Sequence, residues 1–254
     1  MLVTNGCSFV WGDELEGYDD QPSSHHDQTF AYQLAEKLEV PLTNLATCGA
    51  CNHKIYRDTL NFIMKNGKDI THLVIIWSAW QRDEMAMSMP REEEERLKIQ
   101  RWECMTQISP TRLSSIPEPQ RSVMDDYYLG AHDPRTDIVH QLTYMKHMQL
   151  TCDLLGIKIC QGAFHERMWQ NVLGIMHPKH NTKEEDDCHW GDLMDTIERD
   201  LIILRDECRI GLGRYIDMFQ LARTQHNIHE FGHPDKHTHA EYALLLEHIF
   251  RTQT

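Results

Sequence analysis

The sequence predicts one α/β domain, built as a three-layer α/β/α sandwich around a parallel sheet of about five strands. Two observations support this prediction. Short apolar runs alternate along the chain with longer segments whose apolar residues recur at helical spacing. One run, residues 73–77 (LVIIW), is apolar throughout, which is typical of a strand buried on both faces of a parallel sheet.

Each expected element follows from its own pattern. Pro41 closes the first helix and Gly156 caps the third, because neither residue type continues a helix well. Residues 201–228 are ambiguous between helix and strand. The expected strands cover residues 1–4, 42–46, 73–77 and 157–160. The expected helices, each with an apolar side, cover residues 30–38, 53–65, 137–155 and 240–250.

The domain is expected to span residues 1–254, with two insertions. Residues 88–135 carry an acidic run, several prolines and scattered aromatic residues, whereas residues 165–200 are rich in His, Asp and Glu. Neither stretch continues the alternation of strands and helices. We expect both to form a lid or walls around a ligand site.

Composition narrows the classes of function. A net charge of −14 argues against general nucleic-acid binding and against an anionic membrane surface, since both need clustered Lys and Arg. No apolar run is long enough to span a bilayer, and the N-terminus lacks the pattern of a signal peptide. Eight irregularly spaced cysteines then indicate reduced thiols and a cytoplasmic protein. We expect no nucleic-acid or membrane partner.

Candidate site residues lie where loops follow the strands. In a parallel α/β sheet, the loops at the carboxyl ends of the strands form the ligand crevice. Three such loops stand out, together with the segment HEFGHPDKHTHAEYA that precedes the last helix. The three loops are residues 6–8 (GCS), 49–52 (GACN) and 77–82 (WSAWQR).

These loops contain the groups that acyl transfer requires. Ser8 becomes a nucleophile only beside a base, and His233 can serve as that base. Glu230, three residues earlier, can orient the imidazole. The amides of Ser8 and Gly49 are candidate oxyanion donors, and the side chain of Asn52 can add another.

Three blocks resemble the SGNH (GDSL-type) hydrolases, particularly their divergent versions in bacteriophage genomes. The blocks are NGCSFVWG (residues 5–12), NLATCGACN (residues 44–52) and EFGHPDKHTHAEYA (residues 230–243), in the family order. The resemblance implies the flavodoxin-like fold of that family, with Ser8 as nucleophile and Gly49 as oxyanion donor. It also implies His233 as base and Glu230 as orienting acid, with no organic cofactor and no metal.

The sequence departs from the family pattern in three places. Cys7 stands where the family commonly has Asp, and Glu230 stands where the last block usually has Asp. The third block, normally Gly-x-Asn-Asp, is replaced by residues 78–81 (SAWQ), so its oxyanion asparagine is missing. Asn52 or Gln81 could substitute. The expected reaction is hydrolysis of a small acyl ester, such as an acetate on a carbohydrate or a similar alcohol.

Several of these residues have a second interpretation. His239 competes with His233 as the base, and its other role is to begin the last helix. Asp235 can cap that helix or orient the base. Trp77 and Trp80 can line a substrate pocket or pack in the core, and Arg82 can bind an anionic substrate group or pair with Glu84.

Three rival functions remain open from the sequence. The missing asparagine favours a non-catalytic SGNH-like binding protein. Thiol chemistry could use Cys7 with the CxxC of residues 48–51, although Cys7 is expected to pack away from the exposed Ser8. A metal-dependent hydrolase could use clustered histidines, whose spacing matches no metal motif. These clusters comprise His226, His229, His233, His237 and His239, and His177, His180, Cys188 and His189.

Overall fold

The structure, a computed structural model, describes residues 1–13, 15, 26–79, 82–86, 105–108, 134–163 and 234–252. It confirms the α/β class. Four parallel strands form one sheet in the order β2-β1-β3-β6, and these are the parallel strands found in the described ranges. They are β1 (Leu2–Gly6), β2 (Leu42–Asn44), β3 (His72–Trp77) and β6 (Lys158–Ala163).

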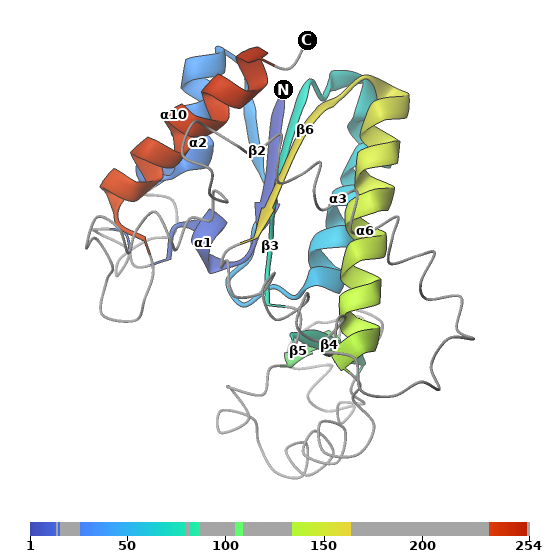
Figure 1. The fold of residues 1–254 in the computed structure, drawn as a ribbon. Helices are drawn as coiled ribbons and strands as arrows, with labels where there is room; N and C mark the ends of the chain where they lie inside the picture. The colour runs from blue at the N-terminus through green and yellow to red at the C-terminus, as the bar shows by residue number, and fades with distance from the viewer. Residues whose placement is uncertain are drawn as a thin grey trace, which may run out of the picture.

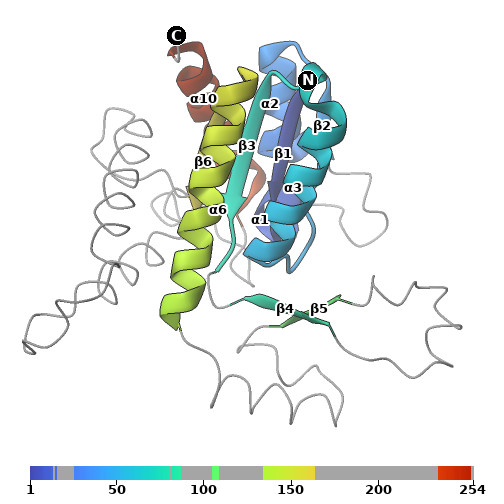
Figure 2. The same ribbon diagram turned by 90° about the vertical axis from the view of Figure 1, so that its right-hand side faces the viewer.

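The helices form a layer on each face of this sheet (Figure 1). One layer contains α2 and α10, and the other contains α3 and α6 (Figures 1 and 2). The short helix α1 lies at the carboxyl end of β1. The helices are α1 (Ser8–Trp11), α2 (Phe30–Leu38), α3 (Asn52–Asn66), α6 (Pro134–Leu155) and α10 (Lys236–Thr252), with short 3-10 turns η1 (His26–Gln28) and η2 (Gly67–Asp69).

Local signals explain where the helices begin and end. Thr29 begins α2 by accepting a hydrogen bond from the amide of Tyr32 at 3.3 Å. Glu39 ends it in the left-handed conformation, with φ of 55°. Asp235 begins α10, because its Oδ1 accepts from the amide of Thr238 at 2.8 Å and from its hydroxyl at 2.9 Å. The expectation that Asp235 caps this helix is thus confirmed.

The boundaries differ from expectation mainly at polar ends. Helix α2 matches residues 30–38, and α10 begins four residues before the expected residue 240 because Asp235 supplies a cap. Strand β6 extends to Ala163 instead of ending at Cys160, since Gln161, Gly162 and Ala163 continue the pairing with β3. Residues 201–228 lie outside the described ranges.

The strand order creates a switch point between β1 and β3. From β1 the chain passes through α2 to the edge strand β2, then crosses through α3 to β3 on the other side of β1. Ligand crevices in open α/β sheets lie at such points, outside the carboxyl ends of the strands. In this chain that edge carries Ser8 after β1 and Ser78 after β3.

The core lies between the sheet and both helical layers. All five residues of β1 are buried, as are the last five of β3, which is the pattern expected of strands covered on both faces. Helix α10 packs on α2 through Tyr242, whose ring meets that of Phe30 edge-on at 5.1 Å. The largest fully buried side chains include Trp77, Tyr242, Phe30 and Phe250.

An antiparallel pair of strands, β4 (Asp83–Ala86) and β5 (Met105–Ile108), follows β3. It lies beyond the carboxyl ends of the sheet (Figures 1 and 2). Strand β5 and the first residues of α6 are the described parts of the expected insertion at residues 88–135, and the expected insertion at 165–200 lies outside the described ranges. None of the helices in these ranges has the length and hydrophobicity needed to cross a membrane.

Candidate active site

Ser8 is the first residue of α1, two residues after β1 ends at Gly6. Helix α1 ends at Gly12, which adopts the left-handed conformation with φ of 89°. A Cβ atom on Gly12 would also lie 2.7 Å from Cγ2 of Thr29. The second glycine of the motif is therefore required both by its backbone conformation and by the close approach of Thr29.

Gly6 allows α1 to fold back tightly against the sheet. A Cβ atom on Gly6 would lie 2.4 Å from Cγ2 of Val10 and 2.8 Å from the backbone oxygen of Ile76 in β3. A methyl group at Gly6 would therefore displace both the side chain of Val10 and the backbone of Ile76. Residues 7–12, which we call the Ser8 turn, therefore owe their position beside β3 to Gly6.

The sequence predicts that Ser8 is exposed at the rim of the sheet, and this prediction is wrong. Ser8 is 5% exposed, and Phe9 and Val10 are buried with it, because α1 packs its first turn against the core. Cys7 is 1% exposed and belongs to the hydrophobic core, as expected for a packing residue.

The Gly49 loop, which comprises residues 45–51 between β2 and α3, lies beside the Ser8 turn. The backbone amide of Thr47 in this loop donates to the backbone oxygen of Gly6 at 3.2 Å. Nδ2 of Asn44 donates to the backbone oxygen of Val10 at 3.3 Å. Gly49 itself has φ of 77°, a conformation that favours glycine. The two loops that carry the expected oxyanion amides thus adjoin at the carboxyl edge of β1.

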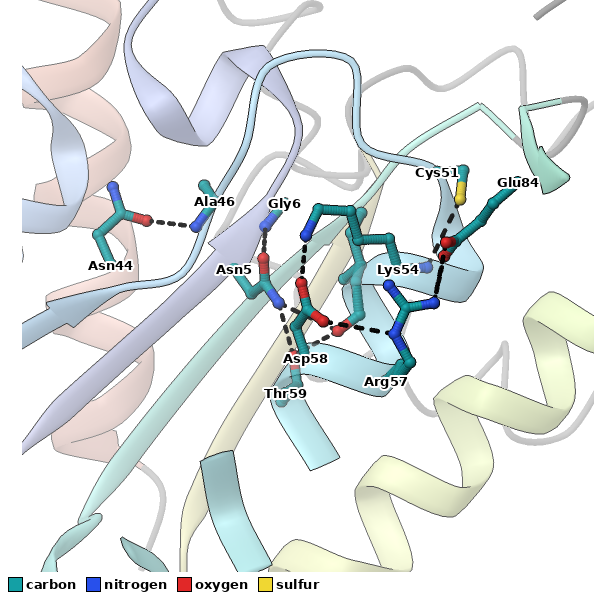
Figure 3. A network of polar contacts seen from close by, with 11 residues as sticks. Asn5, Gly6, Asn44, Ala46, Cys51, Lys54, Arg57, Asp58, Thr59 and Glu84 are labelled. Carbon is teal, nitrogen blue, oxygen red and sulfur yellow. Dashed lines mark hydrogen bonds and ion pairs between the residues drawn. The ribbon is translucent and has the colours of Figure 1, made fainter. Parts of the chain in front are cut away.

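Asn5 fastens the end of β1 to α3 (Figure 3). Its Nδ2 donates to the backbone oxygen of Ile55 at 3.0 Å and to Oγ1 of Thr59 at 2.8 Å. Its Oδ1 accepts from the amide of Gly6 at 2.8 Å. Asn5 begins the first block but was given no role from the sequence; an asparagine directly after the short strand expected at residues 1–4 was the available signal.

Asn52 is engaged inside the protein, which argues against its expected role as an oxyanion donor. Its Nδ2 donates to the backbone oxygen of Ser78 at 3.0 Å and to Oε1 of Gln141 at 3.2 Å. A side-chain amide has two hydrogens, so these bonds use both. Its Oδ1 accepts from the amide of Ser78 at 2.7 Å.

The third loop arranges its residues differently from the expected pocket. Trp77 is fully buried and donates from Nε1 to Oε1 of Gln161 at 3.1 Å, which matches the alternative of core packing and not a pocket wall. Arg82 donates from Nη1 to Oγ of Ser78 at 3.0 Å. Trp80 and Gln81 lie outside the described residues.

Glu84 pairs with Arg57 (Figure 3). Nη1 of Arg57 lies 2.8 Å from each carboxylate oxygen of Glu84, whose side chain is 2% exposed. Burial lowers the pKa of Arg57, but the hydrogen bond and charge of Glu84, together with the charge of Asp58, outweigh it and raise that pKa above its ordinary value. This ion pair joins β4 to α3 at the edge that carries the candidate site.

The last block is described from Pro234 onward, so Glu230 and His233 lie outside the described residues. His239, the competing base, is fully buried. Its Nδ1 accepts from the amide of Phe30 at 3.1 Å, and its ring stacks on that of Phe30 with centroids 6.0 Å apart. His239 therefore joins the starts of α10 and α2.

The described residues offer neither a disulfide nor a metal site. None of Cys7, Cys48 and Cys51 forms a disulfide among the described residues, and Sγ of Cys51 accepts from the amide of Lys54 at 3.5 Å at the start of α3. No group of three or more His, Cys, Asp or Glu side chains suited to a metal occurs in the described part of the chain. His237 is exposed there, and the other clustered histidines apart from His239 lie outside it.

No protein-family model and no curated protein matches this sequence. Among solved structures, the chain is similar to a protein assigned to the G-D-S-L lipolytic family from Desulfitobacterium hafniense DCB-2. That similarity has 7% identity over 98% of both chains and a TM-score of 0.44. It is also similar to the psychrotrophic esterase EstA from Pseudoalteromonas sp., inhibited by monoethylphosphonate, with 9% identity over 98% of this chain and 96% of that one and a TM-score of 0.43. Similarities this loose carry no argument about activity, so the fold class rests on the strand order and the site on its contacts.

Proposed function

We propose that this chain is a serine-dependent ester hydrolase of the SGNH type. Oγ of Ser8 attacks the ester carbonyl while His233 takes its proton, and Glu230 orients the imidazole. His233 returns the proton to the departing alcohol, and water then releases the acid from the acyl-serine. The expected substrate is a small acyl ester, such as an acetate on a carbohydrate or a similar alcohol.

The proposal depends chiefly on the adjoining Ser8 turn and Gly49 loop. The 3.2 Å hydrogen bond from Thr47 to Gly6 fastens the two loops together beside the switch point of the sheet. Glycine lets a substrate approach its backbone closely. The amides of Ser8 and Gly49 are thus suited to an acyl oxyanion that forms on a substrate of Ser8.

The start of α10 supports the role of the last block. His239 in α10 contacts Phe30, and the preceding residue, Thr29, lies in the space that a Cβ atom on Gly12 would enter. A chain of contacts therefore links α10 to the end of α1. Pro234, which is bonded to His233, is buried two residues before α10 begins.

Hydrolysis of p-nitrophenyl acetate by wild type and Ser8→Ala, each with and without EDTA, tests the proposal. We expect wild-type activity to survive EDTA and kcat/KM to fall at least about 10³-fold in Ser8→Ala. Cys7→Ala is the matched control, since it truncates the neighbouring side chain and removes the nearest thiol. That variant should keep serine-dependent turnover, and circular dichroism should show that all three proteins are folded.

A non-catalytic binding protein is the second candidate. It is favoured by the 5% exposure of Ser8 and by the commitment of the Asn52 amide to Ser78 and Gln141. This candidate predicts equal background rates in wild type and Ser8→Ala. Activity lost on adding EDTA would point to a metal-dependent hydrolase, and activity lost only in Cys7→Ala would point to thiol chemistry.

A further inference from the structure

The side chain of Asn52 acts on β3 as a neighbouring strand would. Its carbonyl oxygen accepts from the amide of Ser78 at 2.7 Å, and its amide nitrogen donates to the carbonyl oxygen of the same residue at 3.0 Å. One side chain thereby satisfies both backbone groups of the first residue after β3. Because the two bonds are paired and directional, they fix the position and orientation of the backbone at Ser78.

The contacts around Ser78 extend to α6 and to Arg82, which directly precedes β4. Nδ2 of Asn52 also donates to Oε1 of Gln141 in α6 at 3.2 Å, and Arg82 donates to Oγ of Ser78 at 3.0 Å. Asn52 is 4% exposed, Ser78 is fully buried and Gln141 is 3% exposed. The Asn52 bracket, defined as Asn52, Ser78, Arg82 and Gln141, is therefore a polar network that is buried except at the half-buried Arg82, and its members depend on one another.

The Asn52 bracket lies close in the chain to Gly49, the candidate oxyanion donor. Gly49 precedes Asn52 by three residues, within a turn closed by the bond from the amide of Ala50 to the oxygen of Thr47 at 3.0 Å. Thr47 is fixed to Gly6 on the Ser8 side of that turn. The Gly49 loop is thus anchored at one end to β1 and at the other end, through Asn52, to β3.

We propose that Asn52 is a positioning residue, which fixes the Gly49 amide relative to Ser8 by clamping the start of α3 to the end of β3. The inference rests on the proposed serine hydrolase. In that reaction the oxyanion donors must already be aligned when charge develops, and misplacement by about 1 Å costs about 10²-fold in rate. Asn52 therefore contributes to turnover without touching the substrate.

Asn52→Asp tests the positioning role of the Asn52 bracket. The two side chains have nearly the same shape, but the charge of the aspartate depends on pH. The ionised carboxylate places an oxygen against two acceptors, the backbone oxygen of Ser78 and Oε1 of Gln141. The protonated carboxyl can donate to one of them and restore part of the clamp. At about pH 8 we expect kcat to fall about 10- to 100-fold with KM nearly unchanged, and the ratio of variant to wild-type kcat to rise as the pH is lowered to about 5.5.

Asn66→Asp is the matched control on the same helix. Nδ2 of Asn66 donates to the backbone oxygen of Phe62 at 3.1 Å, at the opposite end of α3 from the site. Its kcat should equal that of wild type at every pH. Gln141→Leu provides a second test if Asn52→Asp does not fold: it removes one acceptor of the clamp and should lower kcat about 3- to 10-fold with KM unchanged.

The outcomes separate the two proposals. Wild-type kcat in Asn52→Asp, or a reduced kcat whose ratio to wild type does not change with pH, overturns the positioning role while leaving the serine hydrolase intact. If Asn52→Asp does not fold, an unchanged kcat in Gln141→Leu overturns it in the same way. If the wild type shows no Ser8-dependent hydrolysis, the proposed function fails and the positioning role fails with it.

Discussion

The two helical layers are attached to the sheet in different ways. The layer of α2 and α10 packs mainly through large apolar side chains, among them Phe30, Tyr242 and Phe250. The layer of α3 and α6 also buries apolar residues, but four amide side chains, two from these helices and two from the strands β1 and β6, join it to the sheet by hydrogen bonds across elements. These are Asn5, Asn52, Gln141 and Gln161.

The two kinds of attachment contribute differently to the stability of the fold and to the geometry of the site. Apolar contacts contribute in proportion to the area they bury and specify direction weakly. Buried amide bonds contribute less net stability, but they require particular distances and angles. Three of the four amides, Asn5, Asn52 and Gln141, lie toward the carboxyl edge, where the Ser8 turn and Gly49 loop meet. We call the layer of α2 and α10 the apolar layer, and the layer of α3 and α6 with its four amide side chains the amide layer. We therefore expect the apolar layer to dominate the free energy of unfolding and the amide layer to dominate the alignment of the site.

Phe30→Ala should have the largest effect on stability. Phe30 is fully buried between His239 and Tyr242, so truncation leaves a cavity and should lower the free energy of unfolding by about 3–5 kcal/mol. Leu244→Ala in α10 is the control, because Leu244 is 53% exposed and should cost little. Urea denaturation followed by circular dichroism measures both. Equal losses in the two variants would contradict an apolar layer built around Phe30.

Asn5→Ala should cost less stability but alter the site more. The change removes the two bonds to α3 and leaves the buried amide of Gly6 without its acceptor, for a loss of about 1–3 kcal/mol. We also expect slower ester hydrolysis than in Phe30→Ala when both are assayed well below their unfolding temperatures. Asn66→Ala, which removes an asparagine bond far from the site, should keep full activity. Full activity in Asn5→Ala would show that the amide layer does not align the site.

His72, which begins β3 and meets the ring of Phe250 in α10 edge-on at 4.9 Å, should make stability depend on pH. Burial, followed by the charges of Lys158 and the N-terminal ammonium, lowers the pKa of His72 below its usual 6.5. The unfolded chain therefore binds a proton at this residue before the folded chain does, so stability is lost as the pH falls below about 6.5. His72→Gln should reduce this loss, whereas His248→Gln, at an exposed position of α10, should not. Urea midpoints measured from about pH 7.5 down to about pH 5 would show the difference.

The apolar layer and the central strand of the sheet were largely predictable from the sequence, because helical periodicity and continuous apolar runs indicate buried faces directly. The helix at residues 30–38 and the strand at residues 73–77 appear with boundaries within one residue of expectation. The capping role of Asp235 was also predictable, since that signal is local. In each case the pattern that reveals the element lies within the element itself.

The amide layer was not predictable, because its bonds join residues far apart in the chain. Asn52 was assigned to the oxyanion from its proximity to Gly49, but its partners Ser78 and Gln141 lie 26 and 89 residues away. Trp77 was considered for a pocket because it ends a strand, yet its indole bonds Gln161, 84 residues away. Only the packed sheet shows which side chains meet.

The residue that reacts with a fluorophosphonate probe is the most direct test of Ser8 as the nucleophile. A serine nucleophile forms a covalent phosphonyl adduct, and peptide mass spectrometry identifies the residue that carries it. We expect one adduct, on Ser8, that is absent in Ser8→Ala and retained in Cys7→Ala. An unlabelled wild-type protein, or an adduct on a residue other than Ser8, would contradict it.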